Sequence, residues 1–145
     1  RPTTEQPIYN MLKRDQVEGE VEEACAKYGI GLVVWSPLGG GLLTGKYNDG
    51  VPAGSRGANS NWLDRALTEE NIDKVRQLTD LANEMGTTMP ALALAWTLKN
   101  PVVSSAITGA TKPSHVEQNL KALEVEITDE INDKIEAILD NDPTK

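Results

Sequence analysis

The sequence has a single cysteine, Cys25, and a single histidine, His115. One cysteine cannot form an internal disulfide, and a metal cluster cannot form around it when only one imidazole is present. We therefore predict no metal site. A chain so poor in cysteine fits a reducing compartment best, and we expect a cytoplasmic protein.

Long apolar runs and basic clusters are also missing. No stretch approaches the 18 or more apolar residues of a membrane span, so we expect no direct membrane insertion. There are 14 Lys and Arg against 22 Asp and Glu, a net charge of -8. Much of the acidic charge lies on predicted helix faces, as in residues 18–23, and this balance argues against nucleic acid as a partner.

The 145 residues have the composition of an ordinary globular domain, with 39% apolar and 25% charged residues. The first residue is Arg1 rather than methionine, and no leader with a basic start and an apolar core comes before the globular pattern. We therefore expect the numbering to begin inside a longer protein.

Apolar runs that resemble strands alternate with stretches of helical periodicity. The expected strands are 8–12, 31–35 and 102–108. Residues 31–35 have the continuous apolar, β-branched character of a strand buried on both faces, and residues 102–108 indicate a further buried strand. The expected helices are 15–28, 68–85, 88–100, one from Thr111 or Ser114 to Leu123, and 128–140. The expected caps of the first three are Asp15, Thr68 and Thr88. Gly29 would end the first helix, and Pro90 lies in the first turn of the third. This order predicts a parallel α/β sheet. Three strands are too few to close a barrel, so we expect further strands upstream.

The segment from Trp35 to Lys46 carries the densest chemical signal, because it follows a strand and contains three consecutive glycines. Ligands bind at the carboxyl ends of strands in parallel sheets and barrels. Glycine lets backbone N–H groups approach a phosphate closely, and Lys46 and Arg56 add positive charge. The pattern predicts a phosphate-bearing ligand, although glycines alone would equally fit a flexible loop.

Two known glycine motifs do not fit. A P-loop would need Ser or Thr after Lys46, where Tyr47 stands. The dinucleotide fingerprint would need a third glycine where Thr44 stands, and the segment does not open a helix.

Residues 109–119 form a second candidate anion site after the third strand. A hydroxyl, a lysine and free N–H groups at a helix start attract an anion through amide geometry and the helix dipole. Taken alone, this segment fits an ordinary capped helix with His115 facing solvent equally well. Two such sites after consecutive strands favour the anion reading, since a barrel's phosphate site is built from its last two strand loops.

Together these residues carry a family resemblance. Gln6, residues 35–39, residues 45–47, the region around Pro52, Ser55 and Arg56, the helix 88–96 and residues 109–113 with Gln118 and Asn119 resemble an aldo-keto reductase. The resemblance is closest to the bacterial homologues of the voltage-gated potassium channel beta subunit. It implies the C-terminal part of a (β/α)8 TIM barrel, strands six to eight with their helices. Residues 1–145 would then be a partial domain that holds NADP(H).

The resemblance also implies a role for each matching residue. Gln6 would hydrogen-bond the nicotinamide carboxamide, and Trp35 would stack on the nicotinamide ring, although Trp35 by itself reads as a core aromatic. The pyrophosphate would contact Ser36, Pro37, Leu38, Gly39 and Gly40, with Lys46 and Arg56 beside it. The adenosine and its 2′-phosphate would contact Gly109, Thr111, Lys112, His115, Gln118 and Asn119.

Three positions depart from the family pattern. His115 stands where relatives commonly have Arg or Gln, Gln118 where Glu is frequent, and Gly54 where the channel subunits have Tyr. A phosphate contact through histidine would weaken at high pH, so the preference between NADPH and NADH stays open.

The implied activity is reduction of a small aldehyde or ketone by hydride from NADPH. The family's catalytic Tyr, Lys, Asp and His belong to the earlier half of the barrel, so no catalytic residue is assigned, and this chain alone is expected to be inactive. Tyr9 is read as a pocket-wall or strand residue, Tyr28 as a helix-face residue and Tyr47 as part of the cofactor loop.

Two other readings stay open. The first is a regulatory module that resembles the channel beta subunits and uses bound NADP(H) as a redox signal. The second is a part-barrel that exists only as a fragment, whose open edges would favour a homo-oligomer. The segment 59–63, with Trp62, is read either as a substrate-pocket wall or as an anchor for the long loop.

Overall fold

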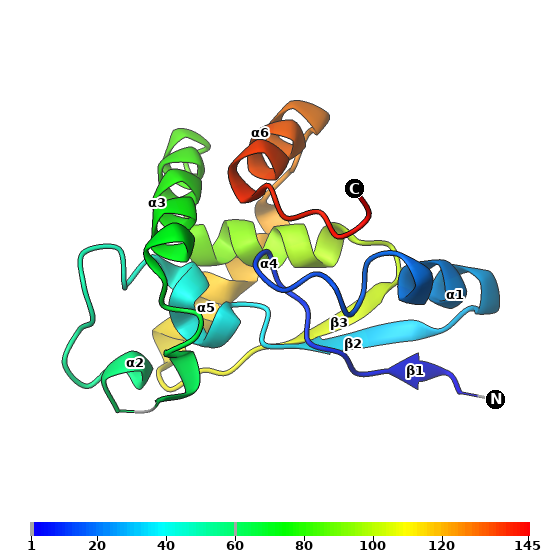
Figure 1. Ribbon diagram of the computed structural model, residues 1–145, viewed down its shortest axis with the longest axis horizontal. Coiled ribbons are helices and arrows are strands. Elements are labelled where there is room, and N and C mark those ends of the chain that lie inside the picture. Colours follow the sequence, from blue (N-terminus) through cyan, green and yellow to red (C-terminus); the bar gives the residue numbers. More distant parts are fainter. Residues whose placement is uncertain (1, 60) are drawn as a thin grey trace.

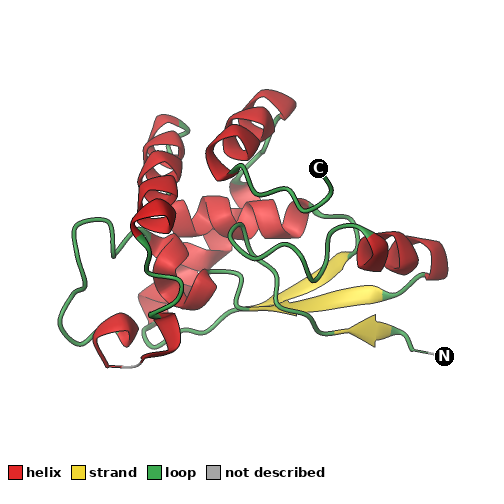
Figure 2. Cartoon of the chain, in the orientation of Figure 1, coloured by secondary structure: helices red, strands yellow, loops and turns green. Residues whose placement is uncertain are grey.

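A computed structural model describes residues 2–59 and 61–145. Strands β1 (Thr4–Glu5), β2 (Gly31–Trp35) and β3 (Val103–Ile107) form a sheet in the order β1-β2-β3, and both pairs are parallel. The helices are α1 (Glu20–Tyr28), α2 (Arg56–Asn59), α3 (Glu69–Glu84), α4 (Met89–Lys99), α5 (Pro113–Leu120) and α6 (Asp129–Leu139), with 3-10 helices η1 (Gly39–Thr44), η2 (Asn61–Leu63) and η3 (Lys121–Glu124). Figure 1 shows α3, α4 and α6 on one side of the sheet, and Figure 2 shows the strands together below them. The predicted parallel α/β sheet is confirmed.

Helices α3, α4 and α6 begin at threonine caps, of which Thr68 and Thr88 were predicted as caps. The hydroxyls of Thr68, Thr88 and Thr128 accept hydrogen bonds from backbone amides three residues ahead, at 3.2, 3.4 and 3.3 Å. Such caps satisfy N–H groups that the first turn leaves without an intrahelical partner. Helix α4 is buried nearly all round, as its apolar run predicts.

The predictions for the N-terminal segment were wrong in two places. The first strand is β1, and of the predicted strand only Ile8 makes a parallel bridge, to Trp35. Beyond it the backbone of Asn10 pairs with that of Lys13 and closes a turn. The helix begins at Glu20 rather than after Asp15, whose carboxylate instead pairs with Lys13 at 2.9 Å.

The prediction that the strands are buried on both faces was also wrong. In β2 the side chains of Leu32 and Val34 are fully buried under the helices, whereas Trp35 on the other face is 40% exposed. In β3, which pairs only with β2 among the described strands, Ser104, Ser105 and Ile107 are exposed. An apolar run shows that a strand is buried, but not how many layers cover it.

The helix after β3 corrects a further prediction, because its N-cap is Lys112 rather than Thr111 or Ser114. Proline at the start of α5 fixes the first turn one residue later than a Thr111 cap would. The helix ends at Leu120, and η3 replaces its predicted last turn. None of the described helices is long and apolar enough to cross a membrane.

A buried polar cluster holds the chain's two ends together. Arg14 is 6% exposed, donates to Glu18 and to Glu136, and lies 5.1 Å from the centre of the Trp96 ring. Burial by itself would lower the pKa of Arg14. Its hydrogen bonds to the two carboxylates outweigh this effect, so the pKa lies above its ordinary value. Tyr9 donates to Glu18 at 2.7 Å, and burial raises its pKa.

Candidate functional site

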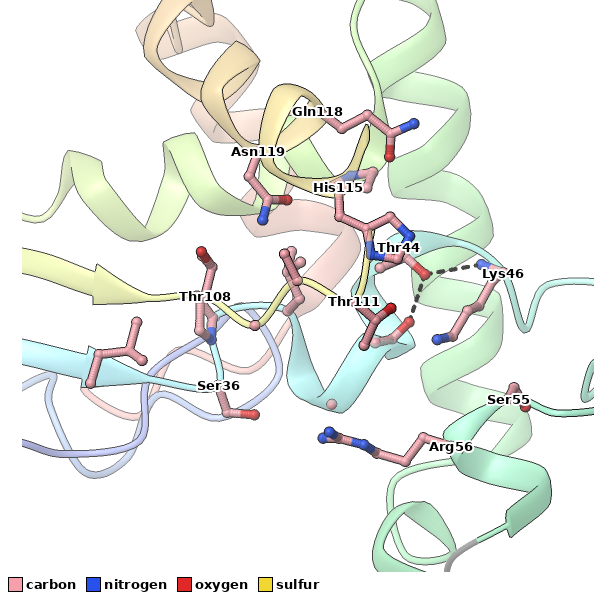
Figure 3. A pocket seen from close by; sticks show the side chains of 18 of the residues that line it. Ser36, Thr44, Lys46, Ser55, Arg56, Thr108, Thr111, His115, Gln118 and Asn119 are labelled. Atoms are coloured by element: carbon pink, nitrogen blue, oxygen red, sulfur yellow. Dashed lines mark hydrogen bonds between the residues drawn. The ribbon is translucent and has the colours of Figure 1, made fainter. Parts of the chain in front are cut away.

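A cleft of about 920 Å³ lies at the carboxyl ends of β2 and β3. Trp35 pairs with Ile107 in the sheet register, so the chain leaves both strands at one edge and two loops face each other. The segment after β2 supplies one wall, the segment after β3 and α5 supply the opposite wall, and residues 54–56 supply a third side (Figure 3). This is the sheet edge at which parallel α/β folds bind ligands.

The charge of the cleft is opposite to that of the chain. Its lining includes Lys46, Arg56 and His115, while no Asp or Glu lines it among the described residues. The whole chain carries a net charge of -8. Figure 3 shows these three side chains arriving from three different segments around Thr111. A hollow edged by basic groups within an acidic protein favours an anionic ligand.

The glycine segment folds tightly upon itself. Gly39, Gly40 and Gly41 have φ values of 55, 67 and 102°, which residues with a Cβ rarely adopt. The amides of Gly39 and Gly41 donate to the carbonyls of Ser36 and Leu38, each at 2.9 Å. Two of the three glycine amides are therefore used inside the loop, and the glycines serve first to make the turn.

Lys46 lies across this turn. A Cβ placed on Gly41 would be 2.8 Å from Lys46 Nζ, so the missing side chain at Gly41 gives the ammonium group its place. The same nitrogen lies 5.1 Å from the centre of the Tyr47 ring, within range of a cation–π contact. The lysine is therefore held at the cleft by two neighbouring residues of its own loop.

Tyr47 also connects the glycine segment to α2. Its buried hydroxyl accepts a hydrogen bond from the amide of Gly57 at 3.0 Å, next to Arg56. Ser55 is among the residues that line the cleft, and its hydroxyl oxygen is buried without a hydrogen-bond partner in the part of the chain that the structure describes. A buried hydroxyl without a partner is costly, so a ligand oxygen there would relieve a real penalty.

Helix α5 forms the opposite wall. His115, Gln118 and Asn119 stand three and four residues apart, which places them on one helix face, and all three line the cleft. Thr108 and Thr111 come from the segment between β3 and the helix (Figure 3).

The cleft brings together twelve of the fifteen residues expected to contact cofactor: Trp35, Ser36, Pro37, Leu38, Gly40, Lys46, Arg56, Gly109, Thr111, His115, Gln118 and Asn119. Gln6, Gly39 and Lys112 are not among the lining residues. Gln6 is exposed and precedes Pro7, whose carbonyl accepts from the Trp35 amide at 3.1 Å, so it lies near the end of β2.

Eight lining residues had no cofactor contact assigned to them from the sequence: Gly41, Thr44, Gly54, Ser55, Pro90, Ile107, Thr108 and Ala110. Most lie inside or beside the two predicted segments, where they could have been included by position. Pro90 gave no such signal, because its helix reads as core throughout.

No tyrosine is among the described residues that line the cleft. Tyr9 packs in the core against Trp96 with ring centres 5.2 Å apart, so its reading as a pocket wall was wrong. Tyr28 is 51% exposed on α1, as expected of a helix face. Ser60 and the side chain of Trp62 lie outside what the structure describes, so the two readings of segment 59–63 stay predictions. Among the described residues, no group of three or more His, Cys, Asp or Glu could hold a metal ion.

The structure is a parallel α/β fold with a cleft edged by basic side chains, and comparison with known proteins gives its family. The model of the aldo/keto reductase family matches residues 1–140. The chain belongs to the aldo/keto reductase family, and its three strands with their helices correspond to the C-terminal part of that barrel.

Similar curated proteins carry channel names. The protein from Oryza sativa subsp. japonica named "Probable voltage-gated potassium channel subunit beta" is 45% identical over 150 residues, which cover 99% of this chain and 46% of the relative. The Arabidopsis thaliana protein of the same name is 44% identical, with 99% and 46% covered. These relatives are from plants, so the predicted closeness to bacterial homologues stays a prediction.

A solved structure matches the fold. The glycerol dehydrogenase from Gluconobacter oxydans superposes with a TM-score of 0.79 and 26% identity, over 98% of this chain and 43% of that chain. The chain thus spans less than half the length of the proteins it matches.

Proposed function

We propose that this chain is the NADP(H)-binding portion of an oxidoreductase that reduces aldehydes or ketones. The observation that carries the proposal is the reversal of charge: the cleft gathers Lys46, Arg56 and His115 in a chain of net charge -8. Family membership supports it, since aldo/keto reductases typically bind NADP(H).

The residues present fit that cofactor. Phosphates need cations and hydroxyl donors, and residues of both kinds line the cleft, including Ser55, whose hydroxyl has no hydrogen-bond partner among the described residues. A nicotinamide needs a flat apolar surface, and Trp35 is 40% exposed at the cleft rather than packed in the core. We assign Trp35 to the ring, the segment of Ser36 to Lys46 and Arg56 to the pyrophosphate, and α5 to the adenosine.

The chain's own part in catalysis would be binding and orientation. A bound nicotinamide cofactor supplies hydride to a carbonyl, which is chemistry the cofactor carries itself. Trp35 would hold one face of the ring, while Lys46 and Arg56 would neutralise the phosphates and fix the cofactor's position. No side chain of the described cleft is placed to act as the tyrosine acid of the family, so turnover would need residues beyond this chain.

His115 and Lys112 are the candidates for recognising a 2′-phosphate. His115 lines the cleft, whereas Lys112 is the exposed N-cap of α5 and would have to turn toward the ligand. We propose NADPH rather than NADH as the preferred cofactor on this ground, a small carbonyl compound as substrate, and a cytoplasmic location for the whole protein.

A regulatory module is the second candidate. It is favoured by relatives at 44 and 45% identity that are named voltage-gated potassium channel subunits beta. Both candidates need the same cofactor cleft. Carbonyl turnover by the full-length protein would support the enzyme, whereas tight NADPH binding without turnover would support the module.

The proposal is tested by calorimetric titration of the chain with NADPH and then NADH. Trp35→Ala should weaken binding on the order of tenfold, because stacking on an aromatic ring contributes about 1 to 3 kcal/mol per base. Trp35→Phe is the matched control, since it keeps an aromatic face and should lose less. A folded wild-type chain that binds neither nucleotide, or equal affinity for folded Trp35→Ala, would contradict the proposal.

A further inference from the structure

The backbone at Ser36 has a conformation that serine does not favour. Its φ is 57°, in the left-handed region, and Asp140 is the one other described non-glycine residue with positive φ. Such a conformation costs an ordinary residue stability and persists when neighbours hold it in place. Ser36 follows Trp35 directly and begins the glycine segment, so its conformation sets the direction of the whole wall.

Asn10 supplies a contact that holds this conformation. Its side chain is 2% exposed, and Nδ2 donates to the Ser36 carbonyl at 2.9 Å. Its Oδ1 accepts from the Leu12 amide at 2.9 Å, and its backbone pairs with Lys13 in both directions, at 3.0 and 3.1 Å. With so many bonds to its own turn, the amide group has little freedom to move away from Ser36.

The same stretch of chain also holds the residue before Ser36. The Trp35 amide donates to the Pro7 carbonyl at 3.1 Å, and the Trp35 carbonyl accepts from the Tyr9 amide at 3.3 Å. These two bonds continue the parallel pairing along β2. The Asn10 bond extends this support one residue beyond the strand, to the point where the backbone turns into the cleft.

We propose that Asn10, which is not among the residues lining the cleft, is a positioning residue for the cleft. By bonding the Ser36 carbonyl it keeps Ser36 in the left-handed conformation, and so presents Trp35 and the glycine segment to the ligand. The identity of the ligand as NADP(H) rests on the proposed function. The positioning of the wall rests on the geometry alone.

The sharpest test is Asn10→Asp in the full chain. Aspartate has nearly the same shape and keeps the acceptor for Leu12, but at neutral pH its carboxylate cannot donate to Ser36. Hydrogen exchange should then speed up at the Gly39 and Gly41 amides on the order of tenfold, because a buried carbonyl has lost its donor. NADPH affinity, measured by calorimetry, should fall by a similar factor.

The matched control is Asn71→Asp on α3. Asn71 Nδ2 also donates to a backbone carbonyl, that of Ala66, at 2.9 Å, but neither residue lines the cleft. This variant should leave the exchange of Gly39 and Gly41 and the NADPH affinity unchanged. An effect equal to that of Asn10→Asp would overturn the proposal, because it would reflect general loosening.

Rescue separates positioning from simple stability. Adding Ser36→Gly removes the cost of positive φ, so the double variant should recover most of the slow exchange at Gly39 and Gly41. If Asn10→Asp fails to fold, the double variant should fold. The proposal is overturned if the double variant recovers neither the slow exchange nor, where Asn10→Asp does not fold, the folded state. It is also overturned if folded Asn10→Asp exchanges Gly39 and Gly41 as slowly as the wild type. If the exchange behaves as expected while the wild-type chain binds no NADPH, positioning stands and the proposed function fails.

Discussion

Replacing Gly41 by alanine should weaken anion binding through Lys46. Gly41 has a φ of 102°, and an added Cβ would lie 2.8 Å from Lys46 Nζ and 3.1 Å from its Cε. Lysine is flexible, so its ammonium group would move off the turn rather than clash. A hydrogen bond to a charged group contributes about 1.5 to 3 kcal/mol, so losing the placed ammonium should raise the Kd for NADPH roughly tenfold or more.

The change also carries a backbone cost that must be separated from this effect. Alanine at positive φ should lower stability by about 1 kcal/mol or somewhat more wherever it is placed. Gly50 provides the control, because its φ is 122° and nothing lies within 4 Å of an added Cβ. Gly50→Ala should therefore match Gly41→Ala in urea unfolding but leave the NADPH affinity unchanged.

A double-mutant cycle with Lys46→Met completes the assay. If Gly41→Ala acts by displacing the ammonium group, it should have little further effect on calorimetric affinity once that group is gone. Equal affinities for the Gly41 and Gly50 variants would refute the reasoning. So would a full additional loss in the Lys46→Met background.

Two further predictions concern stability. Arg14→Met should lower the free energy of unfolding by about 3 kcal/mol, since it leaves the largely buried carboxylates of Glu18 and Glu136 without their cation. Lys74→Met, at a pair on α3 whose Glu70 carboxylate is 75% exposed, should change it by less than about 1 kcal/mol in the same urea titration. Burial and the charge of Glu18 raise the pKa of Glu22, so its ionisation opposes folding. Glu22→Gln should raise the Tm at neutral pH, and the gain should disappear as the pH falls through the carboxyl range; an equal gain at acid pH would contradict this.

Much of the fold was predictable because local signals and packing agree. Thr68 and Thr88 were identified as caps from side-chain chemistry, and no tertiary contact is needed for this. The run from Gly31 to Trp35 was predicted as a strand with the same bounds that β2 has in the structure. The prediction for the N-terminal segment was wrong because its apolar run suggested a strand. In the structure Asn10 closes a turn with Lys13, and the side chain of Arg14 bonds to Glu136, far along the chain.

The residues of the site likewise divide into those that the sequence could identify and those that it could not. The glycines, Lys46, Arg56 and His115 could be nominated from type and position, because phosphate binding needs flexible backbone and cations after a strand. Asn10 and Pro90 could not be identified in this way. Their roles depend on contacts between segments that are distant in sequence: Asn10 and Ser36, for example, are 26 positions apart.

By itself, the sequence determined the order of strands and helices, the main caps and the two segments that carry phosphate-binding chemistry, because each depends on residues within one turn or one loop. The tertiary structure alone decided which face of each strand is covered and how basic side chains from three segments meet at one cleft. It also decided that two glycine amides bond within their own loop, and that Asn10 holds Ser36. These features depend on register and packing between distant segments, which periodicity does not encode.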